Sequence, residues 1–191
     1  MKNPNHDIKP LLDACSQRES WAQMELYNRY SKAMFNVALR ILDDRMEAED
    51  MMQEAFLKAF DKIDQFSREV SFGAWLKKIV VNKSLTQLKK NKHQNTWVTL
   101  DEERMDLDTS SNESSIIDYS DLKVKQVKYC IERLKENYRI VLSLNLIEGY
   151  DLEEIAQIMD LNYGNVRVLV SRAKSKLKSE LLSRKSHGSI G

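Results

Sequence analysis

The 191-residue chain has few residues that interrupt regular structure, with only 5 Gly and 2 Pro. So few turn-forming residues argue against an all-β protein, which needs many turns, and against collagen-like or low-complexity chains. No apolar run approaches the ~20 residues that a membrane-spanning helix requires, and the first residues lack the apolar stretch of a signal peptide. We therefore expect a helical protein of the cytoplasm, without membrane insertion.

Cysteine and histidine are equally scarce. Cys15 and Cys130 lie far apart and neither has a CxxC partner, so reduced thiols are expected rather than a disulfide or a zinc site. The three histidines, His6, His93 and His187, are scattered and show no metal-ligand spacing. The sequence therefore predicts neither a metal nor a cofactor.

Charge is balanced overall but strongly segregated along the chain. The 30 Lys and Arg against 29 Asp and Glu leave a formal net charge of +1. Acidic residues dominate 43–54 and 96–118, whereas basic residues dominate 77–95 and the part of the chain after Gly164. Two basic stretches suggest two contacts with a polyanion, and the acidic stretches suggest other roles.

One acidic stretch also indicates a domain boundary. Residues 106–118, DLDTSSNESSIID, are polar, Ser-rich and aperiodic, as is typical of a linker. The chain is thus predicted to be all-α, with two small helical domains at residues 1–95 and 119–183, an acidic flexible linker at 96–118 and a disordered tail at 184–191.

The first domain is predicted to be a helical bundle. A short N-terminal helix begins near Pro10. Apolar residues at helical spacing then predict three longer helices, over about residues 21–42, 46–63 and 72–90. Trp21 and Met24 are expected on the inner stripe of the first of these. On the second, Glu47, Asp50 and Glu54 recur at three and four residues and form one exposed acidic face.

The second domain contains the sharpest local pattern. Helices are expected over about 122–134 and 138–147, the latter buried and ended by Gly149. Asp151 and Glu154 form a capping box that opens a short helix, and Asn162 is a suitable N-cap for the next one. Two short helices joined by a tight turn predict a helix-turn-helix.

The outer face of the second helix is basic. It presents Arg167, Ser171, Lys174 and Lys178, whereas apolar side chains line the opposite face. Basic side chains supply contacts to phosphates, and outward residues near the start of such a helix can reach base edges.

These motifs together resemble those of a known family. The segment EAEDMMQEAF (47–56), Phe66 and the segment FGAWLKKIVVN (72–82) are similar to the second conserved region of sigma factors. The segments LEEIAQIM (152–159) and GNVRVLVSRAK (164–174) are similar to the fourth. Over residues 10–182 the layout resembles the extracytoplasmic-function (ECF) group of the sigma-70 family.

The resemblance implies a promoter-specificity subunit without chemistry of its own. Such a subunit binds core RNA polymerase through the β′ clamp helices and the β flap. It recognises the −10 and −35 elements of promoter DNA and helps to melt the duplex. An anti-sigma factor is an expected further partner, because one protein could cover both domains.

The resemblance also assigns roles to individual residues. It places polymerase binding at Glu47, Asp50, Gln53 and Glu54. It places −10 DNA binding at Phe66, Ser67, Arg68, Ser71, Lys78 and Asn82, with Phe66 to Ser71 forming a pocket for a flipped-out base. It places −35 DNA binding at Asn165, Arg167, Val168, Ser171, Arg172 and Lys174. Lys77 and Lys83 are expected to steer phosphates, and Trp75 is expected to pack in the core rather than stack on a base.

Two positions depart from the family pattern. Val168 replaces the usual small hydroxyl residue, which exchanges a phosphate contact for an apolar one. Lys135 stands where many members have proline before the next helix. The linker is open to two interpretations, a flexible tether or a segment that threads toward the polymerase active-site channel.

Two other classes of function remain as alternatives. A stand-alone helix-turn-helix regulator with an N-terminal sensor domain would need no polymerase-docking face. A metal-dependent hydrolase would use Glu47, Glu49, Asp50 and Glu54, but no histidine supports these carboxylates. Helical spacing also points Glu49 away from Glu47 and Asp50.

Overall fold

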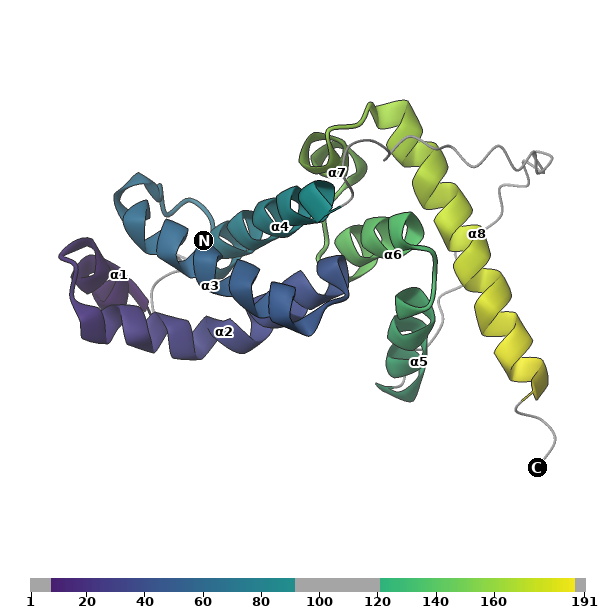
Figure 1. The fold of residues 1–191 in the computed structure, drawn as a ribbon, viewed down its shortest axis with the longest axis horizontal. Coiled ribbons are helices and arrows are strands. Elements are labelled where there is room, and N and C mark those ends of the chain that lie inside the picture. Colours follow the sequence, from purple (N-terminus) through teal and green to yellow (C-terminus); the bar gives the residue numbers. More distant parts are fainter. Residues whose placement is uncertain (1–7, 92–120, 188–191) are drawn as a thin grey trace.

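The computed structural model describes residues 8–91 and 121–187, and within these ranges every regular element is a helix (Figure 1). The predicted linker at 96–118 lies outside the described residues. The order of elements therefore agrees with the predicted all-α class, with one group of helices on each side of residues 92–120.

Four α-helices form the first group: α1 (Lys9–Ser16), α2 (Ser20–Leu42), α3 (Arg45–Asp61) and α4 (Phe72–Asn91). A 3-10 turn, η2 (Ile63–Gln65), follows α3. Helices α2, α3 and α4 pack against one another along their lengths, and α1 covers one end by contacting α2 and η2 (Figure 1). This packing confirms the predicted bundle and leaves one side of both α3 and α4 exposed.

The core of this bundle is built around aromatic rings. Phe72 is fully buried, and its ring contacts those of Tyr30, Phe66 and Trp75. Trp75 stacks on Phe66 with ring centroids 4.9 Å apart, so its packing role agrees with the expectation. Gly73 lets the Tyr30 ring pack closely on α4, because a Cβ atom would lie only 3.0 Å from that ring.

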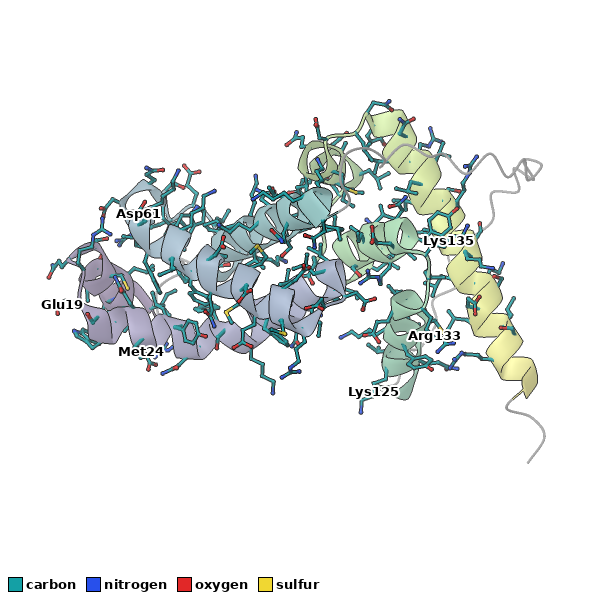
Figure 2. The ribbon with its side chains drawn as sticks, in the orientation of Figure 1. Glu19, Met24, Asp61, Lys125, Arg133 and Lys135 are labelled. Atoms are coloured by element: carbon teal, nitrogen blue, oxygen red, sulfur yellow. The ribbon has the colours of Figure 1, made fainter. Side chains whose placement is uncertain are left out.

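The prediction of which side of α2 is buried is wrong at the N-terminal end of the helix. Trp21 and Met24 are 58% and 60% exposed, and Figure 2 shows Met24 on the outer side of the helix. Ala22 and Leu26, one turn apart, are buried there instead. The prediction placed the largest apolar side chains in the core. The side of α2 that is buried carries the small Ala22 instead, because a small side chain lets neighbouring elements pack closely.

The second group comprises α5 (Asp121–Glu132), α6 (Glu136–Leu142), the π-helix η3 (Ser143–Ile147), α7 (Leu152–Met159) and α8 (Tyr163–His187). Helices α5, α6 and α7 each pack against the long α8, which Figure 1 shows in yellow-green. The helix predicted over 138–147 is thus divided, because its last turn widens to the π form. Gly149 follows with φ of +80°, in the left-handed conformation that commonly ends a helix.

Local capping forms the helix-turn-helix as predicted. Asp151 Oδ1 accepts a hydrogen bond from Glu154 N at 2.8 Å, and Glu154 Oε2 accepts one from Asp151 N at 2.9 Å. Asp160 ends α7 in the left-handed conformation, and Asn162 Oδ1 accepts from Asn165 N at 2.8 Å at the start of α8. The capping box and the N-cap are therefore confirmed.

Helix α8 continues further than the sequence analysis predicts. Residues 184–187, assigned there to a disordered tail, are helical. The chain has no glycine or proline between Asn165 and Gly188, so nothing in the local sequence interrupts the helix before its observed end at His187.

The two groups of helices touch each other. Helix α6 packs against α2, and α7 packs against α4, near the middle of the molecule in Figure 1. The first half of the chain and the helix-turn-helix therefore form one continuous arrangement in this structure.

Candidate functional site

The exposed side of α3 carries the predicted acidic face, which we define as Glu47, Asp50, Gln53 and Glu54. Asp44 begins the helix as its N-cap and accepts a hydrogen bond from Glu47 N at 2.9 Å. Ala48, Met52, Ala55, Phe56 and Ala59 are buried on the other side. The fold thus brings all four predicted polymerase-binding residues onto one surface.

The four residues divide into two rows. Asp50 and Gln53 point outward and are exposed. Glu47 and Glu54 lie on the flank next to α4, where Glu47 Oε1 accepts a hydrogen bond from Asn91 Nδ2 at 2.6 Å and Glu54 forms an ion pair with Lys83. The outward row is therefore the more accessible of the two, and the flank row bonds α3 to α4.

Two apolar side chains that the sequence analysis did not select lie on the same outward row. Met46 is 79% exposed and Leu57 is 70% exposed. With Asp50 and Gln53 they recur at three and four residues, so all four share one face of α3. Large exposed apolar side chains beside polar ones are typical of a protein interface. Spacing alone gives this row, but only the structure shows that nothing else in the described residues covers it.

The predicted base pocket, residues 66–71, is a short loop between η2 and α4. Phe66 is buried against Phe72 and Trp75 and so attaches the loop to the core of the bundle. Arg68 has φ of +64° and forms an ion pair with Asp13 of α1 at 2.7 Å. Ser71 Oγ accepts a hydrogen bond from Ala74 N at 3.2 Å at the start of α4. Ser67 is exposed, so the surface of the loop is polar and its base is aromatic.

Helix α4 presents a polar face beside this loop. Lys78 and Asn82, four residues apart, are both exposed on the same side of the helix. Lys83 is engaged by Glu54, and Lys77 forms an ion pair with Glu148 of the second group of helices. Of the α4 lysines expected near phosphates, Lys77 and Lys83 thus have carboxylate partners in this structure.

The outer side of α8 carries the predicted basic face. Arg167, Ser171 and Lys174 are exposed and recur at three and four residues. Val168, which is 43% exposed, and Arg172 flank this row on one side. Val166, Val170 and Ala173 are buried on the opposite side. Asn165 is half-buried at the start of the helix, where its backbone N–H meets the Asn162 cap.

A second cluster on α8 joins it to α5. The Arg184 guanidinium lies 4.3 Å from the centre of the Tyr129 ring, and Arg133 Nη1 donates to Tyr129 Oη at 3.2 Å. Figure 2 shows Arg133 on the side of α5 that faces α8. The hydrogen bond with Arg184, followed by the charge of Arg133, lowers the pKa of Tyr129. This cluster attaches the C-terminal half of α8, which the sequence analysis did not anticipate.

The described residues offer no other chemical centre. Across 8–91 and 121–187, no group of three His, Cys, Asp or Glu side chains is placed to hold a metal ion. Cys15 and Cys130 are both buried and free, and burial raises the pKa of the Cys15 thiol to about 11. In the same ranges no helix combines the length and apolarity needed to cross a membrane.

Models of known protein families match this chain in both groups of helices. The model of sigma-70 region 2 matches residues 26–94, and a model of sigma-70 region 4 matches residues 125–177. The first range contains α3, α4 and the loop between them, and the second contains the helix-turn-helix.

Individual proteins match over most of their length. The chain is 26% identical to the ECF RNA polymerase sigma factor SigW of Bacillus subtilis over 183 residues, which cover 91% of this chain and 96% of that protein. It is 30% identical to the ECF RNA polymerase sigma-E factor of Escherichia coli K12 over 139 residues, covering 69% of this chain and 72% of that protein.

Solved structures share the fold. The sigma factor RpoE of Bartonella quintana, solved with the anti-sigma factor NepR, has a TM-score of 0.53 at 23% identity, covering 83% of this chain and 95% of that chain. CnrH, solved with the cytosolic domain of CnrY, has a TM-score of 0.51 at 20% identity, covering 91% of this chain and 96% of that chain.

Proposed function

Because the chain belongs to the extracytoplasmic-function group of the sigma-70 family of RNA polymerase sigma factors, we propose that its two exposed faces divide the work of transcription initiation. The acidic face of α3 docks on core polymerase, and the polar faces of α4 and α8 bind the two promoter elements. The observation that carries this proposal is that the acidic and basic faces lie on separate helices, one in each family-matched range.

The polymerase-docking surface is the outward row of α3. Asp50 and Gln53 supply polar groups at its centre, and Met46 and Leu57 supply apolar area at its two ends. The β′ clamp helices are the expected partner. Glu47 and Glu54 contribute charge from the flank while remaining bonded to α4. A partner here gains apolar burial from the two ends and steering from the carboxylates.

The −10 element is bound by the loop at 66–71 and by α4. Lys78 and Asn82 face outward beside the loop, where an amide can pair with a base edge and an ammonium with a phosphate. Ser67 offers a hydroxyl at the loop surface. Three other predicted residues hold the loop in place. Phe66 does so by packing in the core, Arg68 by pairing with Asp13, and Ser71 by bonding to the N-terminus of α4. A loop that is already held in place can receive a flipped-out base without first becoming ordered, which matters because unstacking itself costs a few kcal/mol.

The −35 element is bound by the outer face of α8. Arg167 can form two hydrogen bonds to a guanine edge, which is the commonest specific contact in the major groove. Ser171 and Lys174 continue the same row, and Asn165, Val168 and Arg172 lie beside it. The apolar Val168 favours contact with a thymine methyl group over contact with a phosphate.

The remaining partners follow from the same assignment. Leu146, which is 47% exposed at the end of the buried helix pair, offers an apolar contact for the β flap. An anti-sigma protein is supported by the RpoE structure, which was solved with NepR. The chain supplies no catalytic group in this role, and it acts in the cytoplasm where polymerase and DNA meet.

Variants that separate the two faces test the proposal. Asp50→Arg with Gln53→Arg reverses the outward row of α3 without removing a bond that holds the fold. We expect loss of binding to core polymerase, measured by fluorescence anisotropy, because the reversed charges repel a surface that fits carboxylates. Arg167→Ala should leave that binding intact and reduce transcription from the promoters that wild type selects, by about 5- to 150-fold for 1–3 kcal/mol of lost base contact.

Matched controls keep the two results specific. Asp64→Lys changes one exposed carboxylate in η2, outside the outward row of α3, and should not weaken polymerase binding. Lys176→Ala removes a cation that helical rotation places opposite Arg167, and promoter selection should be nearly unchanged. Full polymerase binding by the Asp50/Gln53 variant would refute the docking surface, and equal loss in Arg167→Ala and Lys176→Ala would refute base-specific reading by α8.

A further inference from the structure

The loop at 66–71 uses most of its predicted contact residues to hold itself in place. Phe66 is buried in the aromatic core. Arg68 is paired with Asp13 of α1 at 2.7 Å, and Ser71 Oγ bonds to the first turn of α4. Of the residues that the resemblance assigns to this loop, only Ser67 is both exposed and not engaged in this way. A base that enters the loop therefore meets other side chains as well.

Two exposed side chains of this loop were not selected by any motif. Glu69 is exposed, and within residues 8–91 and 121–187 its carboxylate has no hydrogen-bond or ion-pair partner. Val70 is 51% exposed. Together with Ser67 they form what we call the loop tip. It offers a hydroxyl, a carboxylate and an apolar side chain to whatever binds there.

The backbone at Arg68 separates the loop tip from the anchor. Arg68 has φ of +64°, in the left-handed region that residues with a side chain adopt only uncommonly. Its ion pair holds the Arg68 side chain on Asp13, whereas its neighbours Ser67 and Glu69 are exposed. One residue of the loop thus binds the protein, and the residues on either side of it remain accessible.

Helix α1 supplies the fixed side of this anchor. Its apolar side chains are buried in the bundle, and it contacts η2, which leads into the loop. Arg18 Nη1 donates to the Phe60 carbonyl at 3.3 Å and so connects the turn after α1 to the end of α3. Helix α1 precedes the range 26–94 that the region 2 model matches. The ion pair is partly exposed and adds little to overall stability, so its main effect is on the loop.

The loop tip adjoins the row of α4 that is proposed to follow DNA. Ala74, Lys78 and Asn82 are all exposed and recur at every fourth residue, so they share one side of the helix. Ala74 N donates to Ser71 Oγ at 3.2 Å, so this row begins where the loop ends. A DNA strand that lies along Lys78 and Asn82 therefore leads to the loop tip.

A carboxylate at this place restricts what the loop can bind. DNA phosphates repel it, and it can only accept hydrogen bonds, so its partner must be a donor on a base. Adenine N6 and cytosine N4 are amino donors at the position where guanine O6 and thymine O4 are acceptors. A carboxylate can thus distinguish the amino bases, adenine and cytosine, from the keto bases, guanine and thymine. An apolar side chain beside it can cover the face of a flipped-out base.

We propose that Glu69 selects an amino base at the flipped-out position of the −10 element, and that Asp13 positions Glu69 by holding Arg68. The inference rests on the proposed function, because it names what the base pocket recognises. Glu69 accepts a hydrogen bond from the exocyclic amino group, and Val70 packs on the face of the base. A keto base is rejected because its carbonyl oxygen faces the carboxylate.

The first experiment measures base preference. The full chain, assembled with bacterial core polymerase, transcribes a pool of templates in which the −10 element of a promoter used by wild type is randomised. Each template carries a transcribed barcode, so sequencing the transcripts gives the preference at every position. We expect one position at which wild type favours adenine and cytosine by about 5- to 150-fold, for 1–3 kcal/mol of base contact. Glu69→Gln should remove this preference, because an amide both accepts from an amino group and donates to a carbonyl.

Two matched variants separate base reading from general effects. Asp64→Asn removes an exposed carboxylate from η2, close to the loop, and should keep the wild-type preference. Val70→Ala should lower transcription for all four bases alike, because it reduces packing without changing a hydrogen bond.

Three results would overturn the role of Glu69: a preference that survives in Glu69→Gln, an equal change in Asp64→Asn, or a wild-type preference for keto bases at every position. In each case transcription by wild type would leave the proposed function standing. Failure of wild type to initiate from any template would refute the proposed function itself, and the role of Glu69 with it.

The second experiment tests Asp13 as a positioning residue. Asp13→Asn and Arg68→Gln each break the ion pair, so both should lower the amino-base preference by up to about fivefold, or about 1 kcal/mol, with polymerase binding unchanged. Asp13→Arg with Arg68→Asp should recover the preference, because it restores the pair and because Asp tolerates the left-handed conformation. Glu19→Gln, which removes an exposed carboxylate just after α1, is the matched control and should behave as wild type. Additive losses in the exchanged pair would contradict the positioning role.

Discussion

The two halves of the chain are stabilised in different ways. The first half has a core of interlocking aromatic rings, in which Tyr30, Phe66, Phe72 and Trp75 contact one another. The second half has an aliphatic core, and within its described residues it relies on explicit caps such as Asp151 with Glu154. Long-range ring packing thus contributes most to the bundle that carries the proposed polymerase-docking face, whereas a capping box and an N-cap define the helix-turn-helix.

The largest expected effect breaks the aromatic core. Phe72→Ala removes a fully buried ring from contact with three others, so the free energy of unfolding should fall by about 3–5 kcal/mol. Urea denaturation followed by circular dichroism measures the change. Because the junction between the halves is polar, we expect helix content of the second half to survive. A loss below about 1 kcal/mol would show that the bundle does not depend on this ring.

A smaller effect tests the caps of the second half. Asp151→Ala removes the acceptor for Glu154 N and breaks the capping box, which should cost about 1 kcal/mol. Asp151→Asn is the matched control, because its side-chain oxygen still accepts that bond and most of the stability should return. Thermal melts of both variants make the comparison, and equal melting temperatures would refute the importance of the cap.

The smallest effect concerns Tyr150, which lies at the junction. Burial, followed by the charges of Glu148 and Glu154, raises the pKa of Tyr150 to about 12 from its ordinary value of 10. The folded state therefore favours the neutral phenol, and its contribution to stability is complete below about pH 10 and is lost as pH rises toward 12. The difference in urea midpoint between wild type and Tyr150→Phe should change in that window alone.

The same hydroxyl is buried without a hydrogen-bond partner among the described residues. At pH 8 the replacement by Phe should therefore change the free energy of unfolding by less than about 1 kcal/mol, since no bond is lost. A larger loss at pH 8, or a midpoint difference that does not depend on pH, would contradict this assignment of the Tyr150 environment.

The features that could be predicted from the sequence are those that depend on residues close together in the chain. The capping box, the Asn162 cap and the acidic row on α3 all involve residues within one or two turns of each other, so spacing was sufficient to find them. Trp21 and Met24 were misplaced because helix periodicity gives relative angles but does not say which side meets a neighbour. The burial of Phe66 likewise depends on Phe72 and Trp75, which only the folded bundle brings to it.

The contacts between the two groups of helices could not be predicted in this way. Arg40 and Glu148 are 108 residues apart in sequence, and neither belongs to a motif. Lys77 was assigned to phosphates because basic residues near a DNA-binding segment usually face phosphates. Its pairing with Glu148 depends on how the two groups of helices meet, and no spacing within either group records that contact.

As a sigma factor, this chain is expected to bind core RNA polymerase. The most direct test is the affinity of the purified full chain for bacterial core polymerase, with a housekeeping sigma factor as competitor. We expect tight binding that the competitor displaces, since both proteins need the same clamp surface. Absence of binding by folded wild type would contradict the assignment of this chain as a sigma factor.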